Sequence, residues 1–513
     1  MKNLLCANVL VTLLFISLQL GAQKFTTTMG PRISADSDYS VGGLLDANAE
    51  ESYVYFWHRD KKTEEKSLSI AKHNEALEEV WFKNFQPAAS NVLIFTGKNY
   101  FYRIIEKETQ KDHRDLLVEP IDRNGKAYKP IVLKSYSTKK NSPELNFKTS
   151  ISPDSTKLVF LTSVDGDERA YHGEYKVYND NMELLHEGKL DLTSTYGDIY
   201  LGHIWVDNNA NIFGEYYEYN NSALKDPVKI KGPKGKSKVS GYDKTAFFIT
   251  AENQDLAFYQ FDFNRKFEQD RVVDYLPSGD IRVITTLMDQ EYDFLTELLF
   301  WEFSPDGQLL TFHKNELSED DHKRINNRPG PATRLSNIVF HTIIPDGSSL
   351  ITLEQNYTFT MGITDFGATT KTGHTSTTYG SADVHLVKFN PRGEIVKYAD
   401  LNKIIESFHI TGALSHSALA LDEDSMVLFY NDHENNDITK RRELLQSTRI
   451  KGMVFCAAIY DGTSFRREIL LEKNSKQRVL AQVSAPIENG YIFIVGNRKG
   501  TGKFHRLLRV EVH

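Results

Sequence analysis

Apolar residues in this chain recur at the spacing of β-strands and not at the spacing of helices. Beyond the first 22 residues, hardly any stretch keeps apolar positions at helical spacing for more than two turns. Short runs rich in Val, Ile, Phe and Tyr instead alternate with turns made of Gly, Asn, Asp and Pro. This is the pattern of strands joined by tight turns. The sequence therefore predicts an all-β protein.

One turn-and-strand segment recurs along the chain. Its clear copies cover residues 151–160, 303–310 and 343–350, and its looser copies cover 205–213, 389–395 and 421–429. In the clear copies Pro presets the first turn position, Asp bonds its own backbone, and Gly takes a positive φ. Each copy therefore predicts a tight hairpin. Repetition of such units indicates a solenoid or a propeller.

The Ser-Pro-Asp-Gly turn followed by an apolar strand resembles the repeat of the TolB-like and WD40-like propellers. Ser155 replaces the usual Gly in the first copy, and Ile344 stands in place of Ser in the third. No Trp-Asp dipeptide occurs in the chain, which disfavours an ordinary WD40 protein. The resemblance implies a β-propeller built of four-stranded antiparallel blades, and it implies nothing about function.

We expect eight blades, with seven blades as the runner-up and two separate β domains as a third alternative. The approximate units are 39–83, 89–136, 147–191, 200–276, 281–317, 337–402, 412–471 and 479–513. The region 200–317 can be divided in more than one way, which keeps seven blades open. The last unit shows only three apolar strands, so we expect residues 24–33 to supply its fourth strand. Pairing of the two chain ends would then close the ring and remove an exposed sheet edge.

The N-terminus has the form of a secretory signal peptide, residues 1–22. Residues 3–23 contain no charge and are mostly apolar, Lys2 precedes them, and small residues end the stretch at Ala22. Cleavage after Ala22 would leave residues 23–513 as a single propeller domain without an integral membrane segment. Leu20 fits the small-residue rule for cleavage poorly, so an uncleaved membrane anchor stays open as the alternative.

Composition and cysteine content narrow the class of protein. The 513 residues are 40% hydrophobic and 25% charged, with a formal net charge of -8, which provides a large core and excludes disorder. Loss of the signal removes Cys6 and leaves only Cys456, so no internal disulfide can form. We expect Cys456 to be a small buried residue of a strand. An exported chain without disulfides suits the periplasm or the outer surface of a Gram-negative bacterium.

Sequence motifs of common enzyme and cofactor sites are missing. Residues 235–237 (Gly-Lys-Ser) resemble the end of a phosphate-binding loop, but Ile230 stands where its first Gly is required. No G-x-S-x-G nucleophile elbow and no H-E-x-x-H zinc motif occurs. Residues 432–437 look superficially like a calcium loop, but Asp437 stands where the sharp turn needs Gly. We therefore expect no metal and no cofactor, although catalytic groups scattered in the sequence would leave no such trace.

Three insertions interrupt the strand rhythm, at 221–244, 318–336 and 362–382. Loops on a rigid β scaffold often carry binding residues. The first insertion holds a lysine cluster that could touch an anionic glycan, a lipid headgroup or an acidic protein face, or could simply keep the loop soluble: Lys229, Lys231, Lys234, Lys236 and Lys238. The other two insertions bring together His322, Lys323, Arg324, Arg328, Arg334, His374 and Tyr379. From them we predict a ligand-binding rim of Arg328, Arg334, His374 and Tyr379.

Aromatic residues cluster in several strands, among them Tyr53, Tyr55, Phe300, Trp301 and Phe303. They could form a sugar-stacking surface. In strands, however, aromatic side chains more often fill the space between neighbouring sheets, and we favour this interpretation.

These features favour an exported, non-catalytic propeller that acts as a binding or scaffold protein of the bacterial envelope and contacts a protein or glycan through its loops. Nucleic acid is disfavoured as a partner because the chain is acidic and offers no aromatic and basic platform. The alternative is a propeller enzyme, such as a polysaccharide lyase or glycoside hydrolase, with residues converging on the central funnel from different blades. Two carboxylates, or a His with a Tyr or Arg, in one concave pocket would favour the enzyme.

Overall fold

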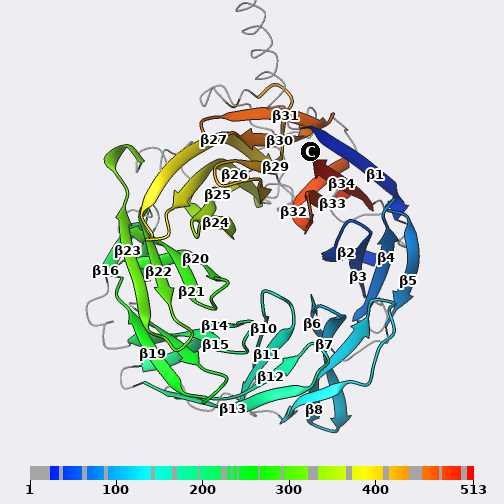
Figure 1. The fold of residues 1–513 in the computed structure, drawn as a ribbon, viewed down its shortest axis with the longest axis vertical. Helices are drawn as coiled ribbons and strands as arrows, with labels where there is room; N and C mark the ends of the chain where they lie inside the picture. The colour runs from blue at the N-terminus through cyan, green and yellow to red at the C-terminus, as the bar shows by residue number, and fades with distance from the viewer. Residues whose placement is uncertain are drawn as a thin grey trace, which may run out of the picture.

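Eight four-stranded antiparallel sheets form a ring in the computed structural model of the chain (Figure 1). The structure describes the ranges 24–33, 39–59, 66–85, 90–139, 145–164, 170–194, 197–220, 228–232, 235–239, 242–263, 266–289, 294–321, 333–364, 373–407, 415–436, 438, 453–472, 477–497 and 505–513. The all-β prediction and the prediction of eight blades are both confirmed.

Each of the first four blades runs from an innermost to an outermost strand. Blade 1 has β2 (Tyr39–Ala47), β3 (Glu51–Arg59), β4 (Lys66–Asn74) and β5 (Glu79–Asn84). Blade 2 has β6 (Ser90–Thr96), β7 (Tyr100–Gln110), β8 (His113–Asp122) and β9 (Ile131–Ser137). Blade 3 has β10 (Leu145–Ile151), β11 (Lys157–Val164), β12 (Ala170–Asn179) and β13 (Leu184–Thr193). Blade 4 has β14 (Gly197–Val206), β15 (Ile212–Asn220), β18 (Tyr242–Ile249) and β19 (Leu256–Phe261).

The other four blades continue the ring in chain order. Blade 5 has β20 (Phe267–Tyr275), β21 (Ile281–Asp289), β22 (Phe294–Phe303) and β23 (Leu309–Glu316). Blade 6 has β24 (Thr333–Ile343), β25 (Ser349–Thr364), β26 (Gly373–Phe389) and β27 (Ile395–Ser407). Blade 7 has β28 (His416–Ala420), β29 (Met426–His433), β30 (Met453–Tyr460) and β31 (Phe465–Leu471). Blade 8 has β32 (Gln477–Ile487), β33 (Gly490–Asn497), β34 (His505–Val512) and, as its outer strand, β1 (Phe25–Ile33).

The division between blades 4 and 5 differs from the expected units 200–276 and 281–317. Strand β20 is the innermost strand of blade 5, whereas the expectation placed it at the end of blade 4. The reason is an additional hairpin of β16 (Val228–Gly232) and β17 (Gly235–Val239), which is inserted between β15 and β18 and forms a sheet of its own. The hairpin lengthens blade 4 along the sequence, and the expected boundary after residue 276 falls one strand too late.

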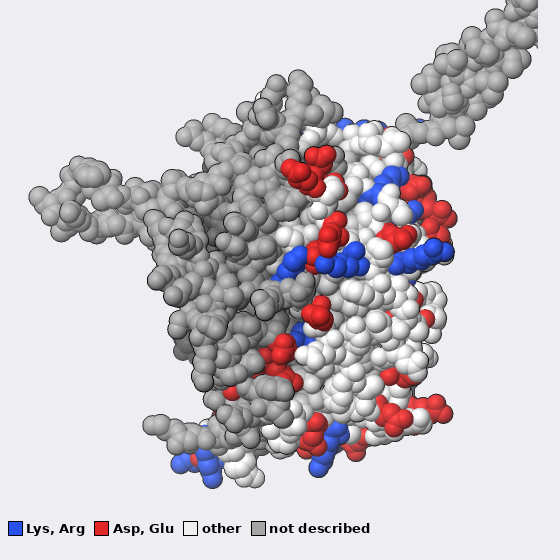
Figure 2. All heavy atoms as spheres, turned by 90° about the vertical axis from the view of Figure 1, so that its left-hand side faces the viewer, with Lys and Arg blue, Asp and Glu red and all other residues white. Residues whose placement is uncertain are grey.

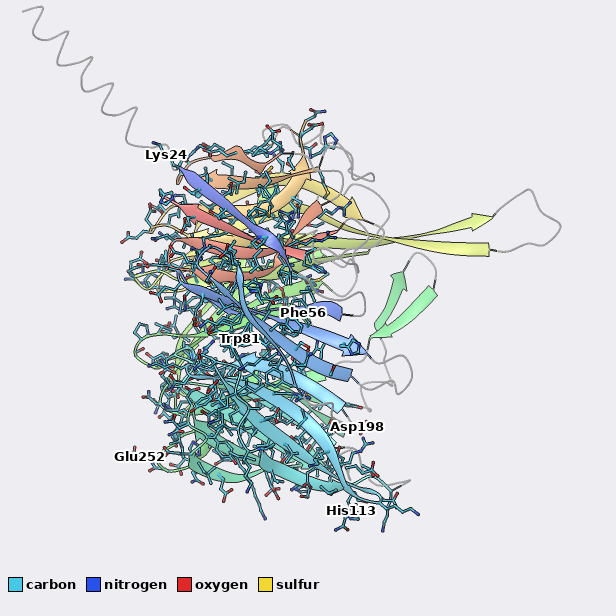
Figure 3. The ribbon with its side chains drawn as sticks, turned by 90° about the vertical axis from the view of Figure 1, so that its right-hand side faces the viewer. Lys24, Phe56, Trp81, His113, Asp198 and Glu252 are labelled. Atoms are coloured by element: carbon cyan, nitrogen blue, oxygen red, sulfur yellow. The ribbon has the colours of Figure 1, made fainter. Side chains whose placement is uncertain are left out.

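Connections between strands fall on two sides of the ring. The turns that join the first to the second strand and the third to the fourth strand of each blade lie on one side, which we call the turn face. The connections from second to third strands and from one blade to the next lie on the other side, the loop face. Figure 3 shows both sides: Glu252 lies on the turn face, His113 on the loop face, and the hairpins β16–β17 and β25–β26 project from the loop face.

The recurrent turns have the predicted geometry. Gly307 and Gly347 take φ values of 86° and 82°, and each donates its backbone N–H to the residue three positions earlier, at 2.9 Å. Ser155, which replaces the usual Gly, takes the same left-handed conformation with a φ of 59°. The copies occupy both kinds of turn position within a blade. They nevertheless all lie on the turn face, because antiparallel strands alternate in direction.

The hydrophobic core consists of layers between neighbouring blades. Phe300, Trp301 and Phe303 are buried between blades, and so is Tyr53, which confirms the core interpretation for these aromatic residues. Cys456 is buried and free, and burial raises the pKa of its thiol to about 12. In the ranges that the structure describes, no helix is long and apolar enough to cross a membrane.

Candidate functional site

Three of the four residues of the predicted ligand-binding rim lie on strands of blade 6. Arg328 lies outside the described residues. Arg334 on β24 pairs with Tyr357 of β25, and Tyr379 on β26 pairs with Thr358 of β25, so these two predicted residues occupy adjacent rows of one sheet. His374 lies five residues before Tyr379 on β26, about 17 Å further out along the strand at about 3.4 Å per residue. Successive rows alternate between the two faces of a sheet, so the register places Arg334 and Tyr379 at positions on opposite faces, two strands apart, and places His374 further out. The register therefore does not gather these positions, and the rim stays a prediction.

The predicted lysine cluster falls largely on the β16–β17 hairpin. Lys229 pairs with Lys238 and Lys231 pairs with Lys236, so the backbone register places these four positions on one face of the hairpin. Lys234 lies outside the described residues.

The turns of the turn face carry three times as many acidic as basic residues. This side is seen edge-on at the right of Figure 2. The acidic residues are Glu50, Glu75, Glu78, Asp154, Asp180, Glu183, Asp207, Glu252, Asp255, Asp280, Asp306, Asp346, Glu394, Asp422, Glu423, Asp424, Asp461 and Glu488. The basic residues are Lys24, Lys98, Arg123, Lys126, Lys129 and Arg392.

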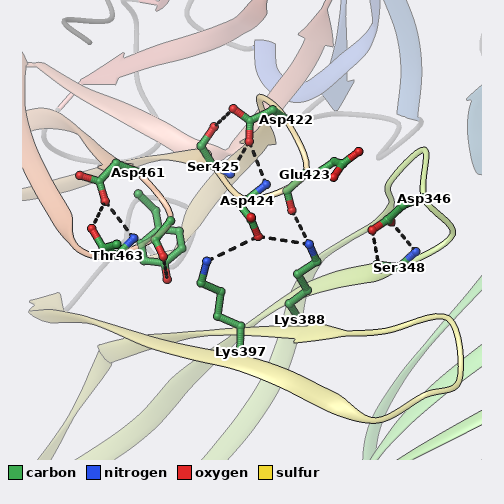
Figure 4. Close-up of polar contacts among 12 residues, drawn as sticks. Asp346, Ser348, Lys388, Lys397, Asp422, Glu423, Asp424, Ser425, Asp461 and Thr463 are labelled. Atoms are coloured by element: carbon green, nitrogen blue, oxygen red, sulfur yellow. Dashed lines mark hydrogen bonds and ion pairs between the residues drawn. The ribbon is translucent and has the colours of Figure 1, made fainter. Parts of the chain in front are cut away.

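Several acidic groups of the turn face have structural roles. Asp461 accepts hydrogen bonds from Thr463, and Asp424 pairs with Lys388 of blade 6 at 3.2 Å (Figure 4). These acids cap their own turns or link neighbouring blades. An anionic partner is therefore not expected on the turn face.

The innermost strands surround the ring axis (Figure 1) and carry two polar clusters. The first lies where blades 4 and 5 meet. Strand β14 has a bulge here, because Leu201 pairs with Tyr216 and Ile204 pairs with Gly214, which leaves Gly202 and His203 opposite a single residue of β15. Such bulges redirect side chains and occur often beside functional sites. His203 is exposed on this innermost strand.

The first position of this bulge is crowded and favours glycine. A Cβ at Gly202 would lie 2.9 Å from the ring of Tyr217 and 3.0 Å from the backbone oxygen of Glu215. A side chain here would force the Tyr217 ring and the backbone at Glu215 to shift. The local sequence therefore permits the bulge that displays His203.

Behind the bulge, two carboxylates and two cations form a closed network. The Lys244 Nζ lies 2.7 Å from Glu215 and 2.9 Å from Glu268, and Arg271 Nε lies 2.6 Å from Glu215. Glu215 and Lys244 are fully buried. Burial raises the pKa of Glu215 even though Lys244 and Arg271 oppose this shift. The carboxylates are thus engaged within the protein and cannot reach a ligand.

The exposed side of this network is aromatic and cationic. The rings of His203 and Trp205 lie 5.7 Å apart, and the guanidinium carbon of Arg271 lies 5.8 Å from the Trp205 ring. Partial burial and the charges of Arg271, Lys148 and Lys244 lower the pKa of His203. The imidazole is therefore neutral at pH 7 and can both donate and accept a hydrogen bond. We call His203, Trp205, Arg271 and Lys148 the bulge site.

The second cluster lies behind a cavity of about 570 Å³ in the inner wall of blades 6, 7 and 8. The cavity is lined by Asn337, Ile338, Val339, Phe340, His416, Ser417, Ala418, Ser484, Pro486 and Tyr491. The Ser417 hydroxyl bonds to Ala481 O and to the Ser484 hydroxyl, and Tyr491 donates to Ala418 O at 2.7 Å.

His416 does not present its imidazole to this cavity. Its side chain is fully buried, with Nε2 2.8 Å from the Thr352 hydroxyl and Nδ1 3.4 Å from the Glu354 carboxylate. Burial lowers the pKa of His416. Burial alone would raise the pKa of Glu354, but Lys403 and His416 outweigh it and hold that pKa well below its usual range. The cavity wall is therefore neutral and polar, and it offers no acid or base to a ligand.

Sequence reasoning missed both clusters. Trp205 was recognised only as part of a loose turn repeat, and no motif connects His203 with Arg271, 68 residues later in the chain. Strand pairing and ring packing bring them together. In the part of the chain that the structure describes, no group of His, Cys, Asp and Glu residues is arranged to hold a metal ion.

Comparison with known proteins finds similarity at the level of the fold. No family model matches the chain. No curated protein matches it either. The WD40 domain of SCAP from fission yeast shares 8% identity and superposes with a TM-score of 0.38, covering 95% of this chain and 94% of that one.

Two further propeller structures have similarly low identities and TM-scores. An ulvan lyase of polysaccharide lyase family PL25 shares 10% identity at a TM-score of 0.36 and covers 94% of this chain and 95% of its own. The β-propeller domain of the Trilobed protease from Pyrococcus furiosus shares 10% identity at a TM-score of 0.33 and covers 89% of this chain and 98% of its own. At these values the likeness is one of propeller architecture, and it carries no argument about activity.

Proposed function

We propose that the protein is an exported, non-catalytic β-propeller that binds a protein or glycan partner in the bacterial envelope. The observation that carries this proposal is the state of the charged groups near the inner wall. Glu215, Glu268 and Glu354 each form an ion pair with a buried lysine, and the imidazole of His416 is buried behind the cavity. Groups held in this way fix the shape of a binding surface and are poorly placed to transfer protons to a ligand.

Export rests on the apolar, charge-free stretch of residues 3–23. The first strand begins at Phe25, so cleavage after Ala22 leaves every strand of the ring in the mature chain. Fractionation of cells that express the full chain tests this part. We expect the protein in the periplasmic or surface fraction with Gln23 as its first residue, and a cytoplasmic chain that begins at Met1 would contradict it.

A propeller enzyme remains the second candidate because the bulge site combines a neutral imidazole with the Arg271 guanidinium. This pair is compatible with the polysaccharide lyase alternative. A glycoside hydrolase needs two accessible carboxylates on either side of the scissile bond, and the carboxylates of the two described clusters are engaged inside the protein.

Binding and chain cleavage can be measured on the same samples. The mature chain is mixed with immobilised envelope polysaccharides and with envelope protein extract, and retained partners are identified after cross-linking. In parallel, the polysaccharides are analysed for shortening by size-exclusion chromatography. We expect retention of a partner without shortening. Progressive shortening of a polysaccharide would contradict the non-catalytic function and support the enzyme. Failure to retain any glycan or protein, together with no shortening, would contradict both.

A further inference from the structure

We propose that the bulge site binds a carboxylate-bearing sugar of an acidic polysaccharide. This inference rests on the proposed function and specifies which class of glycan the protein binds and where. It is carried by the bulge at Gly202-His203, by the cations on both sides of it, and by the two adjacent rings.

The bulge gives the site a fixed position on the inner wall. Two residues of β14 stand opposite Glu215 alone, and Glu215 is held by Lys244 and Arg271. The strand carrying His203 is therefore supported by a buried, neutralised network. A site built on such strands keeps its geometry better than one on a loop.

Arg271 can supply a charged donor to a ligand without leaving the network. Its Nε contacts Glu215 at 2.6 Å and its Nη1 contacts Glu268 at 3.3 Å. Among the described residues, no partner accepts a hydrogen bond from its Nη2, and the side chain is 14% exposed. A carboxylate is the acceptor that suits a planar guanidinium edge.

Lys148 supplies a second cation from the neighbouring blade. It lies on β10, the innermost strand of blade 3, which packs beside β14. In the described part of the chain Lys148 has no acidic partner within ion-pair distance. Arg271 from the following blade and Lys148 from the preceding blade thus place positive charge on both sides of His203.

The two rings favour a sugar over a simple anion. His203 and Trp205 lie 5.7 Å apart with their planes inclined by 38°, and Trp205 is half-buried. An aromatic ring offers an apolar face with a polar edge, which suits a sugar that has C–H groups on one face and hydroxyls at its rim. The neutral imidazole can donate to one hydroxyl and accept from another.

Binding of the mature chain, residues 23–513, to three polymers tests the proposal: polygalacturonate as the carboxylate polymer, dextran sulfate as the sulfate polymer and dextran as the neutral one. We expect polygalacturonate to bind and dextran not to bind. Lys148→Met and His203→Ala should each weaken polygalacturonate binding about tenfold, as expected when a charge-assisted or site-defining contact is lost. Added salt should weaken binding by the parent chain more than binding by Lys148→Met.

The controls are an exposed histidine and a lysine of blade 3 that lie outside the site. His172 is 64% exposed beside Asp191, and Lys176 pairs with Glu187. His172→Ala and Lys176→Met should bind polygalacturonate within twofold of the parent chain. Thermal unfolding of all four variants identifies any that fold poorly.

The binding results distinguish failure of the bulge site from failure of the proposed binding function. Parent-like binding of polygalacturonate by both site variants would overturn the bulge site and leave the binding function standing. Equal, site-dependent binding of dextran sulfate would overturn the preference for carboxylate. If no polymer binds, the inference fails, and retention of an envelope protein then decides whether the broader function survives.

Discussion

Replacement of Lys403 by methionine should destabilise the ring strongly. Lys403 of β27 pairs with Glu354 of β25, and both side chains are fully buried. Glu354 also accepts hydrogen bonds from Ser381, at 2.5 Å, and from Ser415. Lys403→Met would leave a buried carboxylate with hydrogen bonds but without its counter-charge.

The expected loss in the free energy of unfolding follows from the burial of the Lys403 and Glu354 pair. Two unit charges about 3 Å apart attract by about 5 kcal/mol at an effective dielectric constant of about 20. Part of this attraction offsets the cost of removing both charges from water, and breaking one partner of a buried pair typically costs about 3–5 kcal/mol. We expect Lys403→Met to lower the free energy of unfolding by that amount.

Urea unfolding followed by tryptophan fluorescence measures this loss. The matched control is Lys388→Met, which removes another lysine of blade 6 that pairs with Asp424 of blade 7, a side chain that is 61% exposed (Figure 4). An exposed pair contributes about 0–1 kcal/mol. The double variant Glu354→Gln/Lys403→Met removes both charges and should regain most of the lost stability.

Equal stability of the two lysine variants would contradict this prediction. If Lys403→Met unfolds at the same urea concentration as Lys388→Met, then the Lys403 and Glu354 pair contributes no more than a surface pair. The buried pair inside blade 6 would then not stabilise the ring as expected.

Three further predictions concern the whole ring. Stability should fall as the pH drops below about 6.5. Burial lowers the pKa of His416, and it lowers the pKa of His73 to about 4, so the unfolded chain binds protons at a higher pH than the folded chain does. A melting temperature that is constant from pH 7.5 to pH 5 would contradict this. Cys456 should resist a thiol reagent in the folded protein and react only on unfolding, since burial raises its pKa to about 12; rapid labelling of the native chain would show that it is accessible. A chain that begins at residue 34 lacks β1 and leaves the edge of β34 unpaired, so light scattering should detect self-association, and a stable monomer with parent-like melting would show that β1 is dispensable.

Local chemistry determined the repeating parts of the fold. Ser304, Pro305, Asp306 and Gly307 form the predicted turn because proline presets φ and glycine accepts a positive φ, whatever the rest of the chain does. Apolar runs between such turns gave the strands, and their number gave eight blades. The predicted rim of Arg328, Arg334, His374 and Tyr379 is still a prediction, because sequence shows that insertions occur and not what they contact.

The sequence by itself therefore predicted the strands, their turns and the preferred number of eight blades, all of which the structure confirms. Only the tertiary structure decided that β20 begins blade 5, that a bulge displays His203, and that Arg271 and Lys148 flank it from two other blades. Side-chain alternation along a strand shows which residues share a face, but it does not identify the strand that packs against that face. In a ring that identity comes from the packing of successive blades, which brings together residues far apart in the chain.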